Sequence, residues 1–477
     1  MGVPSSPLLI RGAEVVDGTG APRVRSDVLL HGDIVVAVAP PGQLTAPREM
    51  DASGKVLCPG FIDTHSHDDA LVLEQRIPHP KLMQGVTTVV IGNCGISLAP
   101  LVTQHPPAPL DLLGPDSYRF PSFRAYLDAL DNARPALNVV PLVGHNTLRV
   151  AHLPDWRVLA TSEETECMRR AVSQAMDDGA FGLSTGVFYP PSRAAGTDEL
   201  LAVCGPVGER NGIVAMHIRD EGDQIDAALK EALDVGAMAG VRLVLSHHKV
   251  VGSQNFGRTR HTLRAVDIAA RTQAVCLDCY PYEASSTTLS PAKAAATGHV
   301  LISWSKPHPE CAGRTLESIA RDWKLGLEEA ATRLLPGGAI YFGMSTEDVD
   351  RVLAHPLTMV GSDGLPHDAR PHPRLWGTFP RVLSHYVRER RLLTLEEAIR
   401  KMTGLPAQRF GLAHRGTVAV GNVADLVLFD AETVEDRARY EDPQTPPAGI
   451  HAVFVNGKLA VQNGQILESH AGRRLTP

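Results

Sequence analysis

Several features that define large protein classes are missing from this sequence. No uninterrupted apolar run approaches the roughly 18 residues that a membrane-spanning helix needs. The N-terminus has no basic segment followed by a long apolar run, so we expect no export signal. The seven cysteines are scattered and do not form a disulfide framework. These absences argue against a membrane span and predict a protein of the reducing cytoplasm.

A basic charge excess and a phosphate-binding loop are missing as well. The net charge is −7, whereas nucleic-acid-binding proteins usually carry a basic face. No strand-like run is followed by G-x-G-x-x-G or by a P-loop. With 43% apolar residues, the chain has enough hydrophobic material for a large core. We therefore expect neither nucleic acid nor a membrane as a partner.

Eight apolar, strand-like runs alternate with helix-like segments in the middle of the chain. The strand-like runs cover residues 56–67, 86–95, 138–146, 180–186, 213–220, 241–249, 274–282 and 357–364, and helix-like segments include 162–179 and 223–240. Eight such βα units predict an α/β fold, specifically a (β/α)₈ TIM-like barrel. An open doubly wound sheet is the alternative, but it rarely has eight such units without a glycine-rich phosphate loop.

The two ends of the chain resemble each other and differ from the middle. Both contain short β-type runs, and Asn456-Gly457 between two of these runs is a strong hairpin signal. Because domain termini often lie close together, we expect both ends to form one small β-sandwich domain. We predict that this domain comprises 1–56 and 415–477, that a metal-dependent barrel spans 57–414, and that an inserted lid covers about 284–348.

Side chains that can bind metal fall mainly at the C-terminal ends of the predicted strands, where such barrels have their active sites. They are His65, His67, Cys94, His217, the pair His247 and His248, and Asp363. Imidazole, thiolate and carboxylate are the ligands that zinc prefers. His65 and His67 are two residues apart, so on a strand both project to the same side. The sequence predicts a metal site, although alternation does not decide between His247 and His248.

A zinc site of this kind favours hydrolysis. Zinc with an open coordination position polarises a carbonyl group and activates water. Asp363 is the natural candidate for proton transfer, because it lies across the barrel mouth from the histidine pair. We find no nucleophile–base pair for a serine or cysteine mechanism, so the expected target is an amide or a related C–N bond. His145, at the end of the third run, either supports this site or contacts the substrate, or it has a structural role.

The sequence resembles the amidohydrolase superfamily over nearly its whole length. The shared features are GFIDTHSH after a β-rich N-terminus, single histidines on the fifth and sixth strands, and GSDG on the eighth. Six further segments, in order, resemble the N-acyl-D-amino-acid deacylases (D-aminoacylases): GNCGISLAP, GLSTGVFYPP, MHIRDE, SHHKVVGSQNFGR, DCYPYEASSTTL and GSDGLPHDARPHPRLWGTFPR. This resemblance implies an enzyme that uses zinc to hydrolyse an N-acyl-D-amino acid to a carboxylate and a free D-amino acid.

The resemblance also implies a ligand set. One firmly held zinc ion would be bound by Cys94, His217 and His247. A second, weaker metal position would be formed by His65, His67 and Asp363. In such enzymes the aspartate of GSDG is also the catalytic acid and base.

By the same resemblance, the substrate carboxylate would be bound by Arg374, Tyr280 and Ser286, and Tyr189 would lie nearby. A guanidinium group suits this task because it binds a carboxylate through two parallel hydrogen bonds. Without the resemblance, Arg374 would be one arginine among many. The inserted lid would help to shape the pocket for the acyl group or the amino-acid side chain.

Two alternatives remain open at this point. The first is a related amidohydrolase that acts on another amide, such as a hydantoin-like ring or a dipeptide. Hydantoinases of the superfamily bridge two metals with a modified lysine on the fourth strand, and the run AFGLSTG has no lysine. The second is a metal-binding barrel without activity, although such a protein would not need Asp363 as a proton carrier.

Overall fold

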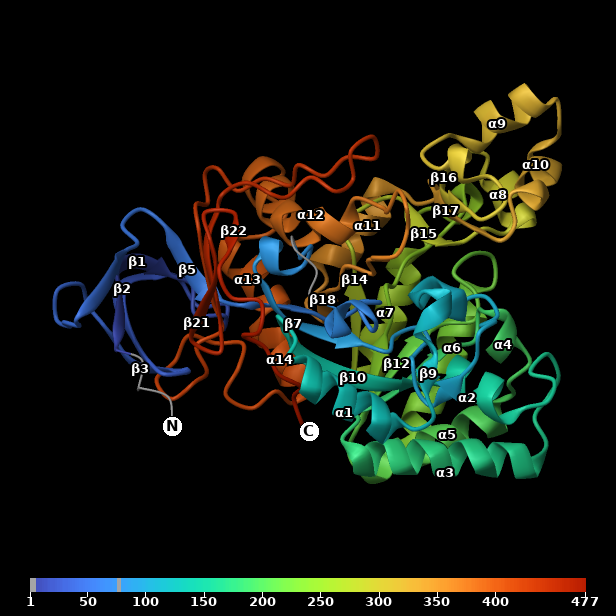
Figure 1. Cartoon of the computed structure of the whole chain (residues 1–477), viewed down its shortest axis with the longest axis horizontal. Coiled ribbons are helices and arrows are strands. Elements are labelled where there is room, and N and C mark those ends of the chain that lie inside the picture. Colours follow the sequence, from blue (N-terminus) through green and yellow to red (C-terminus); the bar gives the residue numbers. More distant parts are fainter. Residues whose placement is uncertain (1–5, 75–78) are drawn as a thin grey trace.

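The computed structural model describes residues 6–74 and 79–477. In this part of the chain, eight parallel strands form a nearly closed barrel, beside which lies a second sheet from both chain ends (Figure 1). The predicted (β/α)₈ fold is confirmed, and the barrel strands follow one another in chain order: β6 (Phe61–Asp63), β7 (Val86–Ile91), β10 (Asn138–Gly144), β11 (Gly182–Gly186), β12 (Ile213–His217), β13 (Arg242–Leu245), β14 (Val275–Cys279) and β18 (Thr358–Val360).

The first and last barrel strands meet through only a few contacts, and these contacts lie next to the predicted site. Asp363 donates its backbone N–H to His65 O at 2.7 Å. A single parallel bridge between Ser66 and Gly364 continues this seam. The seam therefore holds the residues that follow β18 against those that follow β6.

Helices cover the outside of the barrel (Figure 1). Thr161 and Glu164 form a capping box at the start of the longest one, and Gly179 in the left-handed conformation ends it. This helix, α3 (Ser162–Asp178), and helix α6 (Ile225–Ala239) correspond to the helices expected at 162–179 and 223–240. The larger helices are α1 (Phe123–Ala133), α3 (Ser162–Asp178), α5 (Thr197–Glu209), α6 (Ile225–Ala239), α7 (Thr259–Ala269) and α11 (Thr346–Ala354), and shorter ones are α2 (His145–His152), α4 (Pro190–Arg193), α12 (Arg374–Arg381), α13 (Leu395–Met402) and α14 (Gly404–Phe410).

Both chain ends contribute to one mixed sheet, as expected. The strands are β1 (Leu8–Val15), β2 (Val24–His31), β3 (Ile34–Ala39), β4 (Arg48–Asp51), β5 (Val56–Pro59), β19 (Leu426–Phe429), β20 (Ile450–Val455), β21 (Lys458–Gln462) and β22 (Gln465–Ile466). Antiparallel pairing of β5 with β19 joins the two ends. The expected hairpin connects β20 and β21, with positive φ angles of 48° at Asn456 and 74° at Gly457. A core of its own, including Ile10, Leu57 and Phe454, stabilises this sheet.

The run at 56–67 is divided between the two sheets, whereas we expected it to be one barrel strand. β5 belongs to the chain-end sheet, and β6 begins at Phe61. At Gly60, between them, a Cβ atom would come within 2.2 Å of Thr87 Oγ1. Only glycine fits this close approach, and its lack of a side chain lets the chain pass beside Thr87 from one sheet to the other.

Between β14 and β18 the chain leaves the barrel and forms a separate layer, which we call the lid. Its antiparallel strands β15 (Ser285–Thr288), β17 (Gly337–Tyr341) and β16 (Val300–Ser305) lie in that order, and its helices are α8 (Pro291–Thr297), α9 (Leu316–Trp323) and α10 (Leu327–Arg333). The lid has its own apolar core. Lys324, with φ 57°, ends α9 and separates it from α10. In the other long connection, β9 (Arg119–Phe120) pairs with β8 (Leu101–Val102).

None of the described helices is both long and apolar enough to cross a membrane.

Candidate metal centre and active site

Cys94, His217 and His247 come together at the carboxyl ends of three barrel strands. Cys94 follows β7, His217 is the last residue of β12, and His247 follows β13. Cys94 Sγ lies 3.6 Å from His217 Nδ1 and 3.3 Å from His247 Nε2, and all three ligand atoms lie within 4.8 Å of one another. A zinc ion in tetrahedral geometry holds its sulfur and nitrogen ligands about 3.5 Å apart. The three side chains therefore fit a zinc ion.

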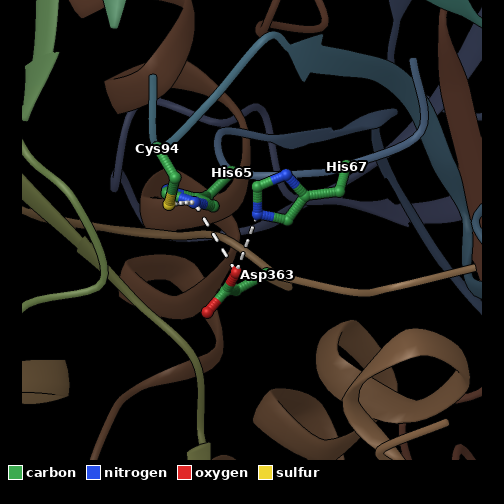
Figure 2. A group of neighbouring side chains, drawn as sticks. All are labelled: His65, His67, Cys94 and Asp363. Atoms are coloured by element: carbon green, nitrogen blue, oxygen red, sulfur yellow. Dashed lines mark hydrogen bonds and ion pairs between the residues drawn. The ribbon is translucent and has the colours of Figure 1, made fainter. Parts of the chain in front are cut away.

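A second group shares Cys94 and includes the histidine pair. His65 Nε2 lies 3.3 Å from Cys94 Sγ. Asp363 Oδ1 lies 3.6 Å from His65 Nε2 and 3.3 Å from His67 Nε2. Figure 2 shows both imidazoles turned toward the Asp363 carboxylate, with the Cys94 sulfur beside His65. All four side chains are buried. A thiolate common to both groups suits two neighbouring metal positions.

Three of these residues have an unusual backbone conformation. The φ angles of Cys94, His247 and Asp363 are 56°, 35° and 51°, in a region that residues other than glycine rarely adopt. Such conformations persist only where the surrounding structure enforces them, and they are common at functional sites. Close packing contributes here, because a Cβ atom at Gly186 of β11 would lie 2.1 Å from Cys94 O.

Glu221 and Lys249 lie behind the zinc-type histidines. Glu221 Oε1 is 3.3 Å from His247 Nδ1 and 3.7 Å from His217 Nε2, the ring nitrogens that face away from Cys94. Lys249 Nζ pairs with Glu221 Oε1 at 2.5 Å. Burial by itself would raise the pKa of Glu221, but Lys249 and the two histidines hold it well below its usual range. An ionised Glu221 fixes the orientation of both imidazoles, as carboxylates behind metal-bound histidines commonly do.

Asp278 on β14 is a further carboxylate at the centre of the site, and no sequence pattern pointed to it. Its Oδ1 accepts the backbone N–H of His247 at 2.8 Å and lies 3.4 Å from His65 Nδ1. Burial raises the pKa of Asp278 to about 7. The only sequence signal was its place in DCYPY, at the end of the seventh strand.

Asp363 and Arg374 form a buried pair on the loop and helix after β18. Arg374 Nη1 lies 2.9 Å from Asp363 Oδ2. Burial would raise the pKa of Asp363, but the Arg374 guanidinium and then the nearby histidines hold it well below its usual range. The carboxylate is therefore ionised at neutral pH and is ready to accept a proton.

The predicted substrate residues surround this arginine. The Arg374 guanidinium lies over the Tyr280 ring at 4.5 Å and donates a hydrogen bond from Nη2 to Ser286 O at 3.0 Å. Among the described residues, Arg374 Nε, Tyr280 Oη and Ser286 Oγ are buried and have no hydrogen-bond partner. Buried donors of this kind usually have a partner, so the arrangement is suited to a ligand with carboxylate oxygens.

Tyr189 packs directly against the zinc-type group. Its ring contacts His217 edge-on, with centroids 5.0 Å apart, and its hydroxyl is 3.1 Å from Thr287 Oγ1 of the lid. Phe188 stacks on the same imidazole at 5.1 Å.

Two histidines whose position the sequence left open lie outside the cluster. The ring of His248 is 2.8 Å from Thr262 Oγ1 of α7, so His247 is the member of the pair that faces the site. His145 is buried, with Nε2 2.8 Å from Glu199 Oε1 and Nδ1 3.3 Å from Ser192 Oγ. These contacts make His145 a structural link between α2, α5 and α4.

Comparison with known proteins agrees with this geometry. The model of the Amidohydrolase family matches residues 48–298 and 317–461. Three curated relatives come from Alcaligenes xylosoxydans xylosoxydans. A D-aminoacylase is 50% identical (98% of this chain, 97% of the relative), an N-acyl-D-aspartate deacylase 49% (98% and 95%), and an N-acyl-D-glutamate deacylase 47% (94% and 92%).

Two solved structures are similar over the same extent. A D-aminoacylase with a binuclear metal centre gives a TM-score of 0.96 at 50% identity, covering 98% of this chain and 99% of that one. An N-acyl-D-glutamate deacylase from Bordetella bronchiseptica, in complex with zinc and a phosphonate mimic of the tetrahedral intermediate, gives 0.94 at 44% identity, covering 98% and 99%. The chain therefore belongs to the amidohydrolase family and, within it, to the N-acyl-D-amino-acid deacylases, or D-aminoacylases.

Proposed function

We propose that the protein uses zinc to hydrolyse N-acyl-D-amino acids to a carboxylate and a free D-amino acid. The observation that carries this proposal is the meeting of a zinc-type Cys94–His217–His247 group with the ionised Asp363 and the buried Arg374 at one barrel mouth. The relatives at 47–50% identity are deacylases of N-acyl-D-amino acids or D-aminoacylases, which supports both the linear amide and the D configuration.

The side chains present are suited to zinc. We assign the firmly held ion to Cys94, His217 and His247, and a second, weaker position to His65, His67 and Asp363, which share the Cys94 thiolate. The related D-aminoacylase structure with a binuclear centre supports two positions. When bound, zinc supplies the Lewis acid that polarises the acyl carbonyl and makes water more acidic.

The chain's own residues carry the remaining steps. Asp363 accepts a proton from the attacking water and delivers it to the leaving nitrogen, which needs an ionised carboxylate at the start. Arg374 holds the α-carboxylate of the substrate through two hydrogen bonds, with Tyr280 Oη and Ser286 Oγ as further donors. Tyr189 packs beside the acyl group, next to His217. The lid keeps water away from the other faces of the substrate, which strengthens these interactions.

Hydrolysis of a hydantoin-like ring is less well supported. A bridging lysine of the hydantoinase type would have to come from β11, which reads GLSTG and has none.

A chiral assay tests the proposed function most simply. The purified protein, with its zinc content measured on the same sample, is incubated with matched N-acetyl-D- and N-acetyl-L-amino acids, a hydantoin and a dipeptide. We expect release of free D-amino acids and little turnover of the other compounds. Hydrolysis of the L series or of the hydantoin at a comparable rate would contradict the proposal.

We also propose that the enzyme works in the reducing cytoplasm, because all seven cysteines are free. The proposed division of labour assigns catalysis to residues 57–414, pocket shape to a lid at about 284–348, and support to the chain-end segments 1–56 and 415–477.

A further inference from the structure

Lys293 on helix α8 of the lid lies beside the proposed site without an acidic partner. Its Nζ atom is 5.5 Å from the ring centroid of Phe188 and 4.6 Å from that of Tyr341. Phe188 in turn stacks on His217, so one ring separates the ammonium group from a zinc-type ligand. Among residues 6–74 and 79–477, no carboxylate forms an ion pair with Lys293.

Two buried cations near the site, Arg374 and Lys249, each lie next to a carboxylate. Arg374 Nη1 lies 2.9 Å from Asp363 Oδ2, and Lys249 Nζ lies 2.5 Å from Glu221 Oε1. Burial lowers the pKa of Lys293, and only Glu221 raises it from a distance. Lys293 is partly buried, and an ammonium group that has lost part of its hydration and has no counter-charge gains free energy when an anion binds. Lys293 is therefore a second cation at this site, besides Arg374, that can bind a negatively charged group of a ligand.

Lys293 also borders a cavity that is large enough for part of a substrate. The cavity has a volume of about 330 Å³ and lies between the lid and the segment 251–256, with Ser285 and Tyr341 in its wall. Its one acidic wall residue, Asp223, already accepts hydrogen bonds from Asn255 at 2.7 Å and Gln254 at 3.0 Å. Of the described residues in the cavity wall, Lys293 is thus the only cationic one. It lies among aromatic and small polar groups, and the Asp223 carboxylate is held by its own hydrogen bonds.

We propose that Lys293 binds a second carboxylate of the substrate, carried by the side chain of an acidic D-amino acid. This inference rests on the proposed function, because Arg374 is taken to hold the α-carboxylate. The amidohydrolase then recognises its substrate through two cations: Arg374 at the start of α12 and Lys293 on α8 of the lid. Sequence identity does not indicate whether the preferred substrate has an acidic side chain. The D-aminoacylase and the deacylases of N-acyl-D-aspartate and N-acyl-D-glutamate are 50%, 49% and 47% identical to this chain.

Matched substrates measure the charge preference directly. The zinc-loaded full-length enzyme is assayed with N-acetyl-D-glutamate and its neutral isostere N-acetyl-D-glutamine, and with the D-aspartate and D-asparagine pair. We expect the acidic member of at least one pair to have a kcat/KM higher by about tenfold or more, because a charge-assisted contact in a desolvated pocket is strong.

Three variants assign that preference to one residue. Lys293→Met keeps the length of the side chain and removes the charge, Lys293→Arg keeps the charge, and Lys306→Met changes an exposed lysine of the same lid. In Lys293→Met, we expect kcat/KM for the acidic substrate to fall about 10- to 100-fold while that for the neutral isostere stays within about threefold. Lys293→Arg retains most of the preference, and Lys306→Met retains all of it.

Other outcomes would overturn the inference. Equal losses on both members of a pair, with a lower Tm, would make Lys293 a structural contact of the lid. A wild-type preference for the neutral isostere would also contradict it. N-succinyl-D-leucine and N-butyryl-D-leucine provide a further arm: an effect of Lys293→Met on the succinyl substrate alone would move the second carboxylate to the acyl group. If neutral D-substrates are cleaved but acidic ones are not favoured, only this inference fails; if no D-substrate is cleaved, the proposed function fails with it.

Discussion

The two ends of barrel strand β12 bury different kinds of side chain. At its first residue, β12 places Ile213 in an apolar cluster with Ile62 and Val244. At its last residue, the same strand places His217 beside the Cys94 thiol. Burial of the apolar end removes hydrocarbon from water and stabilises the barrel. The polar end contains buried charged groups and residues with strained backbone conformations, which serve the site at a cost in stability. Stability and chemistry are therefore divided along one strand, and mutations should affect them separately.

The largest expected effect at the polar end is that of Asp363→Asn. Asparagine cannot accept the proton from water, so kcat should fall by about 10³-fold. The Cys94–His217–His247 group is left intact, and one zinc ion per chain should remain. Steady-state kinetics together with metal analysis of the same preparation measure both quantities. Near-normal turnover would refute the role of Asp363.

Arg374→Ala should have the next largest effect. The loss of two hydrogen bonds to the α-carboxylate should raise KM and lower kcat/KM by about 10²-fold for substrates with a free carboxylate. The methyl ester of the same substrate serves as the control, because it cannot use this contact fully. If the ester loses as much activity as the acid, Arg374 does not bind the carboxylate.

The same variant should also shift the pH profile. Arg374 lowers the pKa of Asp363, so its removal lets burial raise that pKa. Activity that needs the ionised carboxylate would then be lost at a higher pH than in the wild type. A pH series of kcat/KM for the ester measures this acid limb, and a limb that moves to lower pH would contradict the electrostatic role.

Glu221→Gln should weaken metal binding more than chemistry. A neutral amide holds the two imidazoles less firmly, so zinc affinity should fall by about 10- to 100-fold while kcat at saturating zinc changes little. Competition with a chelator measures the affinity. Glu209→Gln, on the exposed end of α5, is the matched control. A loss of kcat that added zinc does not restore would mean that Glu221 takes part in the reaction itself.

The smallest effect on activity is expected from the apolar end. Ile213 is fully buried, and Ile213→Ala should reduce the free energy of unfolding by about 2–5 kcal/mol. Zinc content and kcat below the lowered Tm should stay at wild-type values. A His217→Ala variant tests the other end of the same strand, where zinc should be lost. If Ile213→Ala also releases zinc, the two ends are not independent.

Much of this division could be predicted from the sequence because strands repeat every two residues and metal ligands cluster at strand ends. That pattern predicted the barrel and the candidate metal ligands, whereas the expected substrate residues came from the family resemblance. The pattern did not separate His247 from His248, because adjacent strand residues alternate. The side-chain contacts resolve the choice, because His247 lies against Cys94 and His248 against Thr262, and only the folded chain reveals them.

Other contacts left no pattern in the sequence. Asp278 contacts His65 from a strand more than 200 residues away, and a single aspartate in a strand has no spacing to recognise. The pairing of Arg374 with Asp363 depends on where α12 begins, and the exposure of Lys293 to a cavity depends on how the lid folds back. Each of these is set by tertiary packing, which periodicity does not encode.

Zinc X-ray absorption on the purified enzyme tests the central claim most directly. With one zinc ion per chain, the account predicts one sulfur ligand at about 2.3 Å and nitrogen ligands at about 2.0–2.1 Å, and the sulfur contribution should disappear in Cys94→Ser. A wild-type spectrum with nitrogen and oxygen ligands alone would contradict the claim that Cys94 joins His217 and His247 on the metal.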